Sequence, residues 1–220
     1  MKPAQSSSLI KQKLEQVGLI PVLRARSIEE GHALVDAMMA GGITVVEVTM
    51  TVPNAVALLR ELRKRHGDGL LLGSGTVTDA AQAEATIDAG AEFVVSPSLH
   101  PDVIAKTRQL GKVSIPGALT PTEVITAWRA SADYVKVFPC SAMGGASYLK
   151  ALRAPFPGLK LIPTGGVTLQ TAAEFLKAGA VALGVGSDLV NASAITEGHP
   201  ESITKTARAY LDIIEASRRK

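Results

Sequence analysis

Short apolar runs alternate with longer segments of helical period along the whole chain, about every 20 to 25 residues. The runs are rich in Val, Ile and Leu and are bounded by glycine, proline or polar residues, which is typical of buried strands. The pattern predicts eight strands, at residues 19–23, 43–50, 70–73, 92–96, 113–116, 133–138, 160–163 and 181–185.

The segments between these strands have the apolar spacing of amphipathic helices. Predicted helices begin near Ile28, Pro53, Asp79, Pro101, Pro121, Ala146 and Leu169, a further one runs over 201–218, and another precedes the first strand at 9–17. Two starts have the sequence of a capping box, in which a hydroxyl residue is followed three positions later by a glutamate: Ser27 with Glu30, and Thr120 with Glu123.

Alternation of short apolar strands with helices predicts a parallel sheet. Eight such units in 220 residues favour a single (β/α)8 TIM barrel domain over residues 1–220, with an extra N-terminal helix. An open doubly wound sheet is the alternative. Its dinucleotide-binding version is disfavoured because no Gly-x-Gly-x-x-Gly follows the first strand.

Composition and charge narrow the function classes. The chain is 46% hydrophobic but only 4% aromatic, which suits a core of small aliphatic layers, and its net charge is +3. The basic residues are dispersed, so we expect no nucleic-acid partner, while a mild positive charge suits an anionic small molecule. With one cysteine, no apolar leader and no span of about 20 apolar residues, we expect a cytoplasmic protein without a membrane partner.

Lys136 is a charged residue inside the apolar sixth strand. Strand alternation places it on one face with Tyr134 and Phe138, and Val135 and Val137 on the other. In a barrel the valine face packs on helices, so Lys136 points inward, where lost hydration favours the neutral amine that a Schiff-base nucleophile requires. A buried ion pair or an anion-binding role is the alternative, and this residue alone leaves both open.

Glu47 lies in the same way within the valine-rich second strand, on one face with Thr49 and Thr51. A carboxylate there is costly to bury unless it is paired or used. Imine chemistry needs a proton shuttle, which a carboxylate near the amine provides. A structural pair with Lys136 is compatible with that role.

Two glycine loops follow the last two strands. Thr164, Gly165 and Gly166 follow the seventh strand, and Gly186 and Ser187 follow the eighth. Backbone N–H groups in such loops close around an oxyanion, and in (β/α)8 enzymes these two loops commonly hold phosphate. The sequence therefore predicts a phosphate site here.

Other polar residues follow strand ends. Arg24 ends the first strand, where its guanidinium fits a carboxylate, and Thr76 follows the third strand with a hydroxyl for the same group. The four histidines are far apart and show no ligand spacing, so we expect no metal and no cofactor. His100 is the histidine nearest the expected mouth, and a surface role is favoured for it. Cys140 has no evident partner for thiol catalysis.

These residues together resemble the class I aldolases for 2-keto-3-deoxy-6-phosphogluconate (KDPG) and 4-hydroxy-2-oxoglutarate (KHG). The motifs that carry the resemblance run through all eight units in order, over nearly the whole chain. They are Val22-Leu23-Arg24, Val46-Glu47-Val48-Thr49-Met50-Thr51-Val52-Pro53, Gly73-Ser74-Gly75-Thr76-Val77, Val95-Ser96-Pro97, Ile115-Pro116-Gly117, Val135-Lys136-Val137-Phe138-Pro139, Pro163-Thr164-Gly165-Gly166-Val167 and Gly184-Val185-Gly186-Ser187.

The resemblance implies a homotrimeric carbon–carbon lyase that needs no metal and cleaves KDPG to pyruvate and glyceraldehyde 3-phosphate, with KHG as a second substrate. It matches Lys136 to the Schiff-base lysine, Glu47 to the acid/base and Thr76 to a carboxylate ligand. Phe138 would pack beside the pyruvyl methyl group. The phosphate loops match Gly165, Gly166, Gly186 and Ser187.

One position departs from part of the family. Some members have an arginine four residues after the catalytic glutamate to hold the substrate carboxylate, and this chain has Thr51 there. Others have an arginine at the end of the first strand, as Arg24 does here. Relatives specific for the galactonate epimer also use that arginine, so a phosphogalactonate aldolase is an alternative. The sequence also leaves open a phosphosugar isomerase, a thiamine-phosphate synthase and a non-catalytic trimeric scaffold, although these would not need both Lys136 and Glu47.

Overall fold

The computed structural model describes residues 3–219 and has the alternating order of strands and helices that the sequence predicts. The helices are α1 (Pro3–Val17), α2 (Ile28–Ala40), α3 (Ala55–His66), α4 (Ala80–Asp88), α5 (Pro101–Gln109), α6 (Pro121–Arg129), α7 (Ala146–Arg153), α8 (Ala172–Lys177), α9 (Ala192–Thr196) and α10 (Pro200–Arg218). The strands are β1 (Leu19–Leu23), β2 (Val45–Thr49), β3 (Leu71–Gly75), β4 (Phe93–Val95), β5 (Val113–Ile115), β6 (Gly117–Ala118), β7 (Val135–Val137), β8 (Leu161–Pro163) and β9 (Leu183–Val185).

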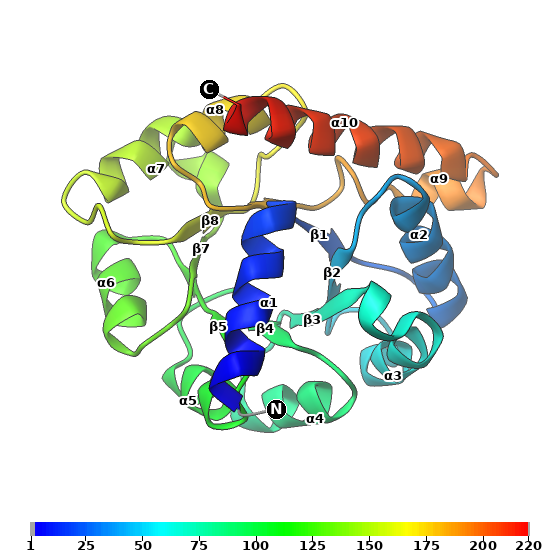
Figure 1. Cartoon of the computed structure of the whole chain (residues 1–220), viewed down its shortest axis with the longest axis horizontal. Coiled ribbons are helices and arrows are strands. Elements are labelled where there is room, and N and C mark those ends of the chain that lie inside the picture. The colour runs from blue at the N-terminus through cyan, green and yellow to red at the C-terminus, as the bar shows by residue number, and fades with distance from the viewer. Residues whose placement is uncertain (1–2, 220) are drawn as a thin grey trace.

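The strands form a curled parallel sheet in two parts. One part has the order β5-β4-β3-β2-β1-β9 and the other β6-β7-β8. An isolated parallel bridge between Thr164 and Gly184 joins β8 to β9. At the other junction the N–H of Tyr134 donates to the carbonyl of Ser114 at 3.3 Å. Helices α2 to α10 lie around the outside of the strands (Figure 1).

The strand predicted at 113–116 ends at Ile115, and a second short strand, β6, which was not predicted, follows Pro116. Proline has no N–H to donate to a ladder, so regular pairing stops there. β5 before it pairs with β4, and β6 after it pairs with β7. The break therefore marks the point at which the chain passes from one part of the sheet to the other.

Two helices also begin elsewhere than predicted, and one further helix was not predicted. The N-terminal helix expected over 9–17 begins at Pro3. The helix expected near Leu169 begins at Ala172, because Thr171 Oγ1 accepts from the N–H of Thr168 at 2.9 Å and holds the intervening residues in a turn. The five-residue helix α9 was not predicted, since it is too short to show a helical period.

Strand alternation separates two apolar clusters. Outward-facing residues such as Val46, Val48, Val135 and Val137 pack against the surrounding helices. Inward-facing residues form a second cluster, which includes Ile20, Val45, Leu71, Phe93, Val113, Tyr134 and Ile162.

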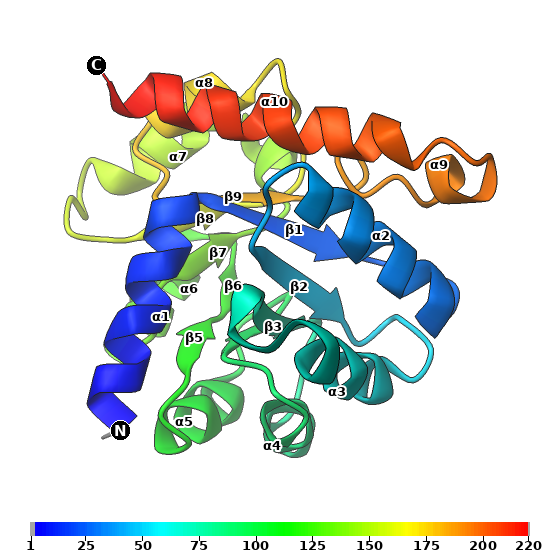
Figure 2. The same ribbon diagram turned by 45° about the vertical axis from the view of Figure 1, so that its right-hand side comes forward.

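Helix α1 closes one end of the curled sheet. Its Ile10 and Leu14 belong to the inward-facing cluster, among residues at the beginnings of the strands. Figure 1 shows α1 across the middle of the face formed by the strands, and Figure 2 shows it beside their ends. The carboxyl ends of the strands remain open on the opposite side, where loops follow them. No helix among residues 3–219 has the length and apolar character needed to cross a membrane.

Candidate active site

Lys136 and Glu47 lie inside the curled sheet, on β7 and β2. Both are almost fully buried, with side chains 8% and 3% exposed, and the Lys136 Nζ lies 3.7 Å from Glu47 Oε1. Their strand neighbours Val135 and Val48 face outward into the helix-covered cluster. The alternation that the sequence predicts thus brings together two charged residues that are 89 positions apart (136 minus 47).

The Glu47 carboxyl is poorly satisfied. Its Oε1 has no hydrogen-bond partner, and Lys136 is its neighbouring cation. Burial raises the pKa of Glu47, because a charged carboxylate loses its hydration there, while the positive charges of Lys136 and Arg24 act in the opposite direction. A buried carboxyl with a raised pKa and a free oxygen is typical of a proton-transfer group.

Gly75, at the end of β3, makes the space that Glu47 occupies. It pairs with Thr49 in the parallel register, and a Cβ at this position would lie 1.9 Å from Glu47 Oε1. Any side chain here would have to displace the carboxyl. The predicted third strand ends at residue 73, so the sequence pattern indicates no structural reason for glycine at position 75. In the structure Gly75 is the last residue of β3, and glycine is needed there because the Glu47 carboxyl occupies the space of a side chain.

A cavity of about 490 Å³ opens beside Lys136 at the carboxyl ends of the strands. It brings together most of the residues singled out from the sequence: Arg24, Thr76, Lys136, Phe138, Thr164, Gly165, Gly166, Gly186 and Ser187. Glu47 lies behind Lys136 rather than in the cavity wall. The wall also contains residues that lie in the sequence motifs or directly after them but have no individual role assigned from the sequence: Val22, Pro97, Val167, Thr168, Gly184 and Asp188.

The aromatic ring of Phe138 lies next to the Lys136 amine, with Nζ 5.4 Å from the ring centroid. Two residues after Lys136 on the same face, Phe138 provides an apolar wall beside the nitrogen. Such a wall excludes water from one side of the amine while leaving the cavity side open.

The glycine loop after β8 has a backbone that requires glycine. Gly165 and Gly166 both adopt left-handed conformations, with φ of +88° and +75°. A Cβ on Gly166 would also lie 2.3 Å from the Cβ of Ser141, in the segment after β7. Beside this loop, Gly184 leaves room for the Thr164 hydroxyl, which would lie 2.1 Å from a Cβ there. The end of β8 can therefore approach β9 closely.

Thr76 has a strained backbone, with φ of +59°, which is rare for a β-branched residue. It lies immediately after Gly75 and lines the cavity. Conformations of this kind tend to cluster at functional sites, where the surrounding structure holds them in place.

Residues 10–206 match the family model for KDPG and KHG aldolases. The chain belongs to this aldolase family. A 2-dehydro-3-deoxy-phosphogluconate aldolase from Treponema pallidum is 35% identical over 205 residues, covering 93% of this chain and 97% of that relative. A 2-dehydro-3-deoxy-6-phosphogalactonate aldolase from Escherichia coli is 33% identical, covering 90% of this chain and 96% of the relative.

A solved structure of the family is similarly close. The KDPG aldolase from Legionella pneumophila, with pyruvate captured at low pH as a covalent carbinolamine intermediate, is 30% identical to this aldolase. The match covers 96% of this chain and 98% of that chain, with a TM-score of 0.84.

Arg24, at the end of β1, is exposed at the cavity wall of the aldolase. The backbone just before it is held from β2, since Thr49 Oγ1 donates to the carbonyl of Leu23 at 2.9 Å. Thr51 stands where some relatives have an arginine. Its Oγ1 lies 2.7 Å from Thr49 Oγ1, and the two hydroxyls form a hydrogen bond. Thr51 thus supports the strand end that carries Arg24.

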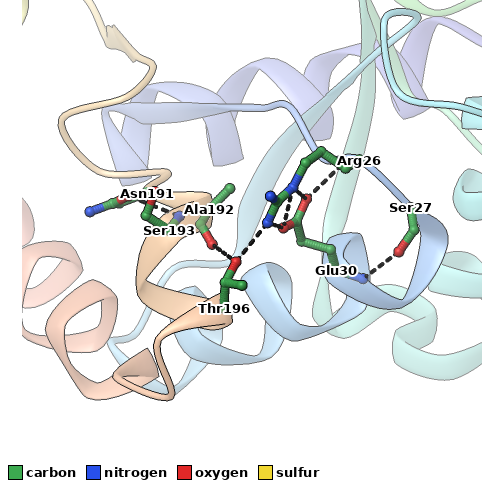
Figure 3. Close-up of polar contacts among 7 residues, drawn as sticks. All are labelled: Arg26, Ser27, Glu30, Asn191, Ala192, Ser193 and Thr196. Carbon is green, nitrogen blue, oxygen red and sulfur yellow. Dashed lines mark hydrogen bonds and ion pairs between the residues drawn. The ribbon is translucent and has the colours of Figure 1, made fainter.

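The segment after Arg24 is also tied to helix α9, which follows β9 in the chain (Figure 3). Arg26 Nη2 donates to Thr196 Oγ1 in α9 at 2.6 Å, and its backbone N–H donates to Glu30 at 2.6 Å. The capping box predicted for Ser27 and Glu30 is therefore only half right. Ser27 Oγ accepts from the N–H of Glu30, but the Glu30 carboxylate accepts from Arg26 instead.

His100 and Cys140 lie outside the cavity wall. His100 Nε2 is 2.9 Å from Ser98 Oγ, at the start of α5. Cys140 is buried, and burial raises the pKa of its thiol to about 11, which disfavours the reactive thiolate. Residues 3–219 contain no group of three His, Cys, Asp or Glu side chains placed to hold a metal.

Proposed function

We propose that this chain is a Schiff-base aldolase that cleaves KDPG to pyruvate and glyceraldehyde 3-phosphate, with KHG as a second substrate. The observation that carries the proposal is the buried Lys136–Glu47 pair, 3.7 Å apart, beside a cavity whose wall includes the two glycine loops. The family match supports the same chemistry, since a relative's structure contains pyruvate as a covalent carbinolamine.

In the proposed reaction, Lys136 loses its proton and attacks C2 of the keto acid as the free amine to form a carbinolamine. The carbinolamine takes up a proton and loses water to give a protonated imine. The C3–C4 bond then breaks, and its electron pair moves toward the imine nitrogen to leave an enamine. Glu47 takes the proton of the C4 hydroxyl as the aldehyde departs, directly or through a water. It then returns a proton to C3, and water releases pyruvate from Lys136.

The remaining cavity residues hold the two anionic ends of the substrate in this proposal. Arg24 and Thr76 bind the carboxylate, and Phe138 packs beside the pyruvyl methyl group. The backbone of Gly165, Gly166 and Gly186 binds the phosphate, together with the hydroxyls of Thr164 and Ser187. Binding at this remote end keeps C4 in register with Glu47.

Sodium borohydride reduction with pyruvate, followed by peptide mass mapping, tests the lysine assignment. The expected result is a single reduced adduct on Lys136, lost in the Lys136→Ala variant and kept in Lys112→Ala, which changes a lysine paired with Glu92 away from the cavity. An unmodified Lys136 would overturn the aldolase proposal and favour a non-catalytic scaffold. Full activity in EDTA is expected as well, since no step uses a metal.

The phosphogalactonate epimer is the second candidate substrate, favoured by Arg24 in the cavity wall and Thr51 in place of an arginine. The Escherichia coli relative named for that activity matches 90% of the chain. Parallel measurements of kcat/KM on the two C4 epimers decide between the substrates. A tenfold preference in kcat/KM corresponds to about 1.4 kcal/mol in transition-state binding.

We further propose that the two parts of the sheet close as one (β/α)8 barrel, with β5 and β6 acting as a single interrupted strand. The Thr164–Gly184 bridge and the backbone hydrogen bond from Tyr134 to Ser114 support closure at both junctions. The family resemblance also implies a homotrimer. Sedimentation equilibrium would then give about three times the chain mass of 22.9 kDa.

A further inference from the structure

Asp188 is an acidic residue in the wall of the cavity, directly after Gly186 and Ser187. The proposed function places a phosphate against this same loop. A carboxylate near a phosphate is unfavourable by simple electrostatics, so its presence calls for a role that outweighs the repulsion. None of the steps proposed above uses it.

The hydrogen bonds of Asp188 indicate that role. Its Oδ2 accepts from the Tyr210 hydroxyl at 2.5 Å and from the backbone N–H of Leu169 at 3.3 Å. Leu169 belongs to the loop after β8, whereas Asp188 belongs to the loop after β9. One carboxylate oxygen therefore connects the two glycine loops directly.

Tyr210 anchors this connection to the body of the protein. It lies in α10 and is completely buried, with its hydroxyl also 3.4 Å from the carbonyl of Val167 in the loop after β8. Burial raises the pKa of Tyr210, and the Asp188 carboxylate raises it further, so the hydroxyl stays protonated as a donor. Because it has one proton to donate, the shorter contact to Asp188 takes precedence over Val167.

The loop after β8 is also stiffened internally. Thr171 Oγ1 donates to the carbonyl of Gly166 at 3.0 Å and accepts from the N–H of Thr168 at 2.9 Å. The loop therefore behaves as a preformed unit, and its distance from the loop after β9 depends on what joins the two. Asp188 joins the two loops through its hydrogen bond with Leu169, and Tyr210 in α10 holds the Asp188 carboxylate in place.

We propose that Asp188 and Tyr210 are positioning residues that set the spacing of the two glycine loops for the phosphate end of the substrate. The inference rests on the proposed function, since it assigns these loops to phosphate. Backbone N–H donors on two separate loops bind one phosphate well only when both sets are at hydrogen-bond distance together, and small misplacements are costly. Lys136 and Glu47 are on β7 and β2, so loosening the loops leaves imine formation intact.

The test uses Tyr210→Phe, which removes one hydroxyl and keeps the ring that fills the core. Without that hydroxyl, Asp188 loses its hydrogen bond to α10, and the two loops are no longer held at a fixed spacing. We therefore expect KM for KDPG and the dissociation constant for inorganic phosphate, measured by calorimetry, to rise about tenfold or more. The rate of borohydride trapping with pyruvate, which has no phosphate, should change less than about twofold.

Three further variants separate positioning from a general loss of structure. Asp188→Ala should behave as Tyr210→Phe does, whereas Asp188→Asn keeps an oxygen that accepts from both Tyr210 and Leu169 and should restore phosphate affinity. Tyr148→Phe removes a tyrosine hydroxyl that donates to the Leu119 carbonyl, away from both loops, and should leave phosphate affinity unchanged.

Equal losses on pyruvate trapping and on phosphate binding would overturn the inference, as would unchanged phosphate affinity in both Tyr210→Phe and Asp188→Ala. Failure of the proposed function looks different, because the wild-type chain would then form no pyruvate adduct. The calorimetric comparison of wild type and Tyr210→Phe with inorganic phosphate still tests the inference in that case.

Discussion

At the residue scale, the main feature is a carboxyl and an amine buried together with one carboxyl oxygen free. Glu47 and Lys136 are 3.7 Å apart, which is longer than a hydrogen bond, so neither group fully satisfies the other. Burial of such a pair is unfavourable unless additional partners are present. A keto acid in the cavity would provide them, which is the reason to interpret the pair as functional.

The raised pKa of Glu47 makes a prediction about stability and pH. A folded chain that binds this proton more tightly than the unfolded chain is most stabilised below the ordinary value of 4.5, and loses that contribution as pH rises through the raised pKa. Glutamine does not titrate. Urea unfolding should therefore show Glu47→Gln gaining stability relative to wild type as pH rises from about 4.5.

The same variant should lose activity, because a general acid/base contributes typically about 10²–10⁴-fold to rate. Steady-state turnover at pH near 7 provides this measurement.

In the urea unfolding experiment, a constant stability difference between Glu47→Gln and wild type across the pH range would show that Glu47 has the same pKa in the folded and unfolded chain.

Gly75 provides a second prediction at this scale. Gly75→Ala adds a methyl group 1.9 Å from the position of Glu47 Oε1, so the carboxyl must move and turnover should fall at least tenfold. Gly69→Ala is the matched control, since a Cβ there meets nothing within 4 Å. Equal activity in the two variants would show that Glu47 has freedom to shift without loss.

At the scale of single elements, end residues decide where helices begin. Helix α6 has the complete capping box: Thr120 Oγ1 accepts from the N–H of Glu123, and Glu123 accepts from the N–H of Thr120. Helix α2 has the same sequence signature but only one of the two hydrogen bonds. Ser27 Oγ accepts from the N–H of Glu30, whereas the Glu30 carboxylate accepts from the N–H of Arg26 instead of that of Ser27. A local motif therefore predicts a helix start more reliably than it predicts the partner of each side chain.

Thr120→Ala should lower the free energy of unfolding by about 1 kcal/mol, because it leaves the N–H of Glu123 without its acceptor. Urea denaturation measures this change. Thr122→Ala, in the same first turn but outside the capping box, should stay within about 0.5 kcal/mol of wild type. A loss of similar size in both variants would indicate that helix propensity, and not the cap, is responsible.

At the scale of the whole molecule, the two ends of the strands have different tasks. Helix α1 packs Ile10 and Leu14 onto the beginnings of the strands, and the cavity with Lys136 opens at their carboxyl ends. Apolar packing therefore closes one end, and the loops that line the cavity are at the other. This division is general among parallel α/β barrels.

Leu14→Ala should lower the free energy of unfolding by about 2–5 kcal/mol, since it leaves a cavity in the inward-facing cluster. Below the unfolding transition, pyruvate trapping on Lys136 should remain as fast as in wild type. Leu9→Ala, at a position 55% exposed on the same helix, is the control and should have little effect. A slower trapping rate in folded Leu14→Ala would show that α1 shapes the catalytic end as well.

The sequence by itself determined the alternation of strands and helices along the chain and the inward direction of Lys136 and Glu47. These follow from periods of two and 3.6 residues, which are local properties of the chain. It also indicated the two glycine loops; Gly165 and Gly166 in the first of them have positive φ angles, which favour glycine. The roles assigned to these residues stay predictions until the trapping experiment is done.

Only the tertiary structure decided which distant groups meet. The fit of Glu47 against Gly75, the tie from Arg26 to Thr196, and the link from Tyr210 through Asp188 to Leu169 have no local signature. Each joins segments that are distant in sequence: neighbouring strands for Glu47 and Gly75, α9 for Arg26, and α10 with two loops for Tyr210. Side-chain contacts of this kind depend on positions in space, which periodicity along the chain does not encode.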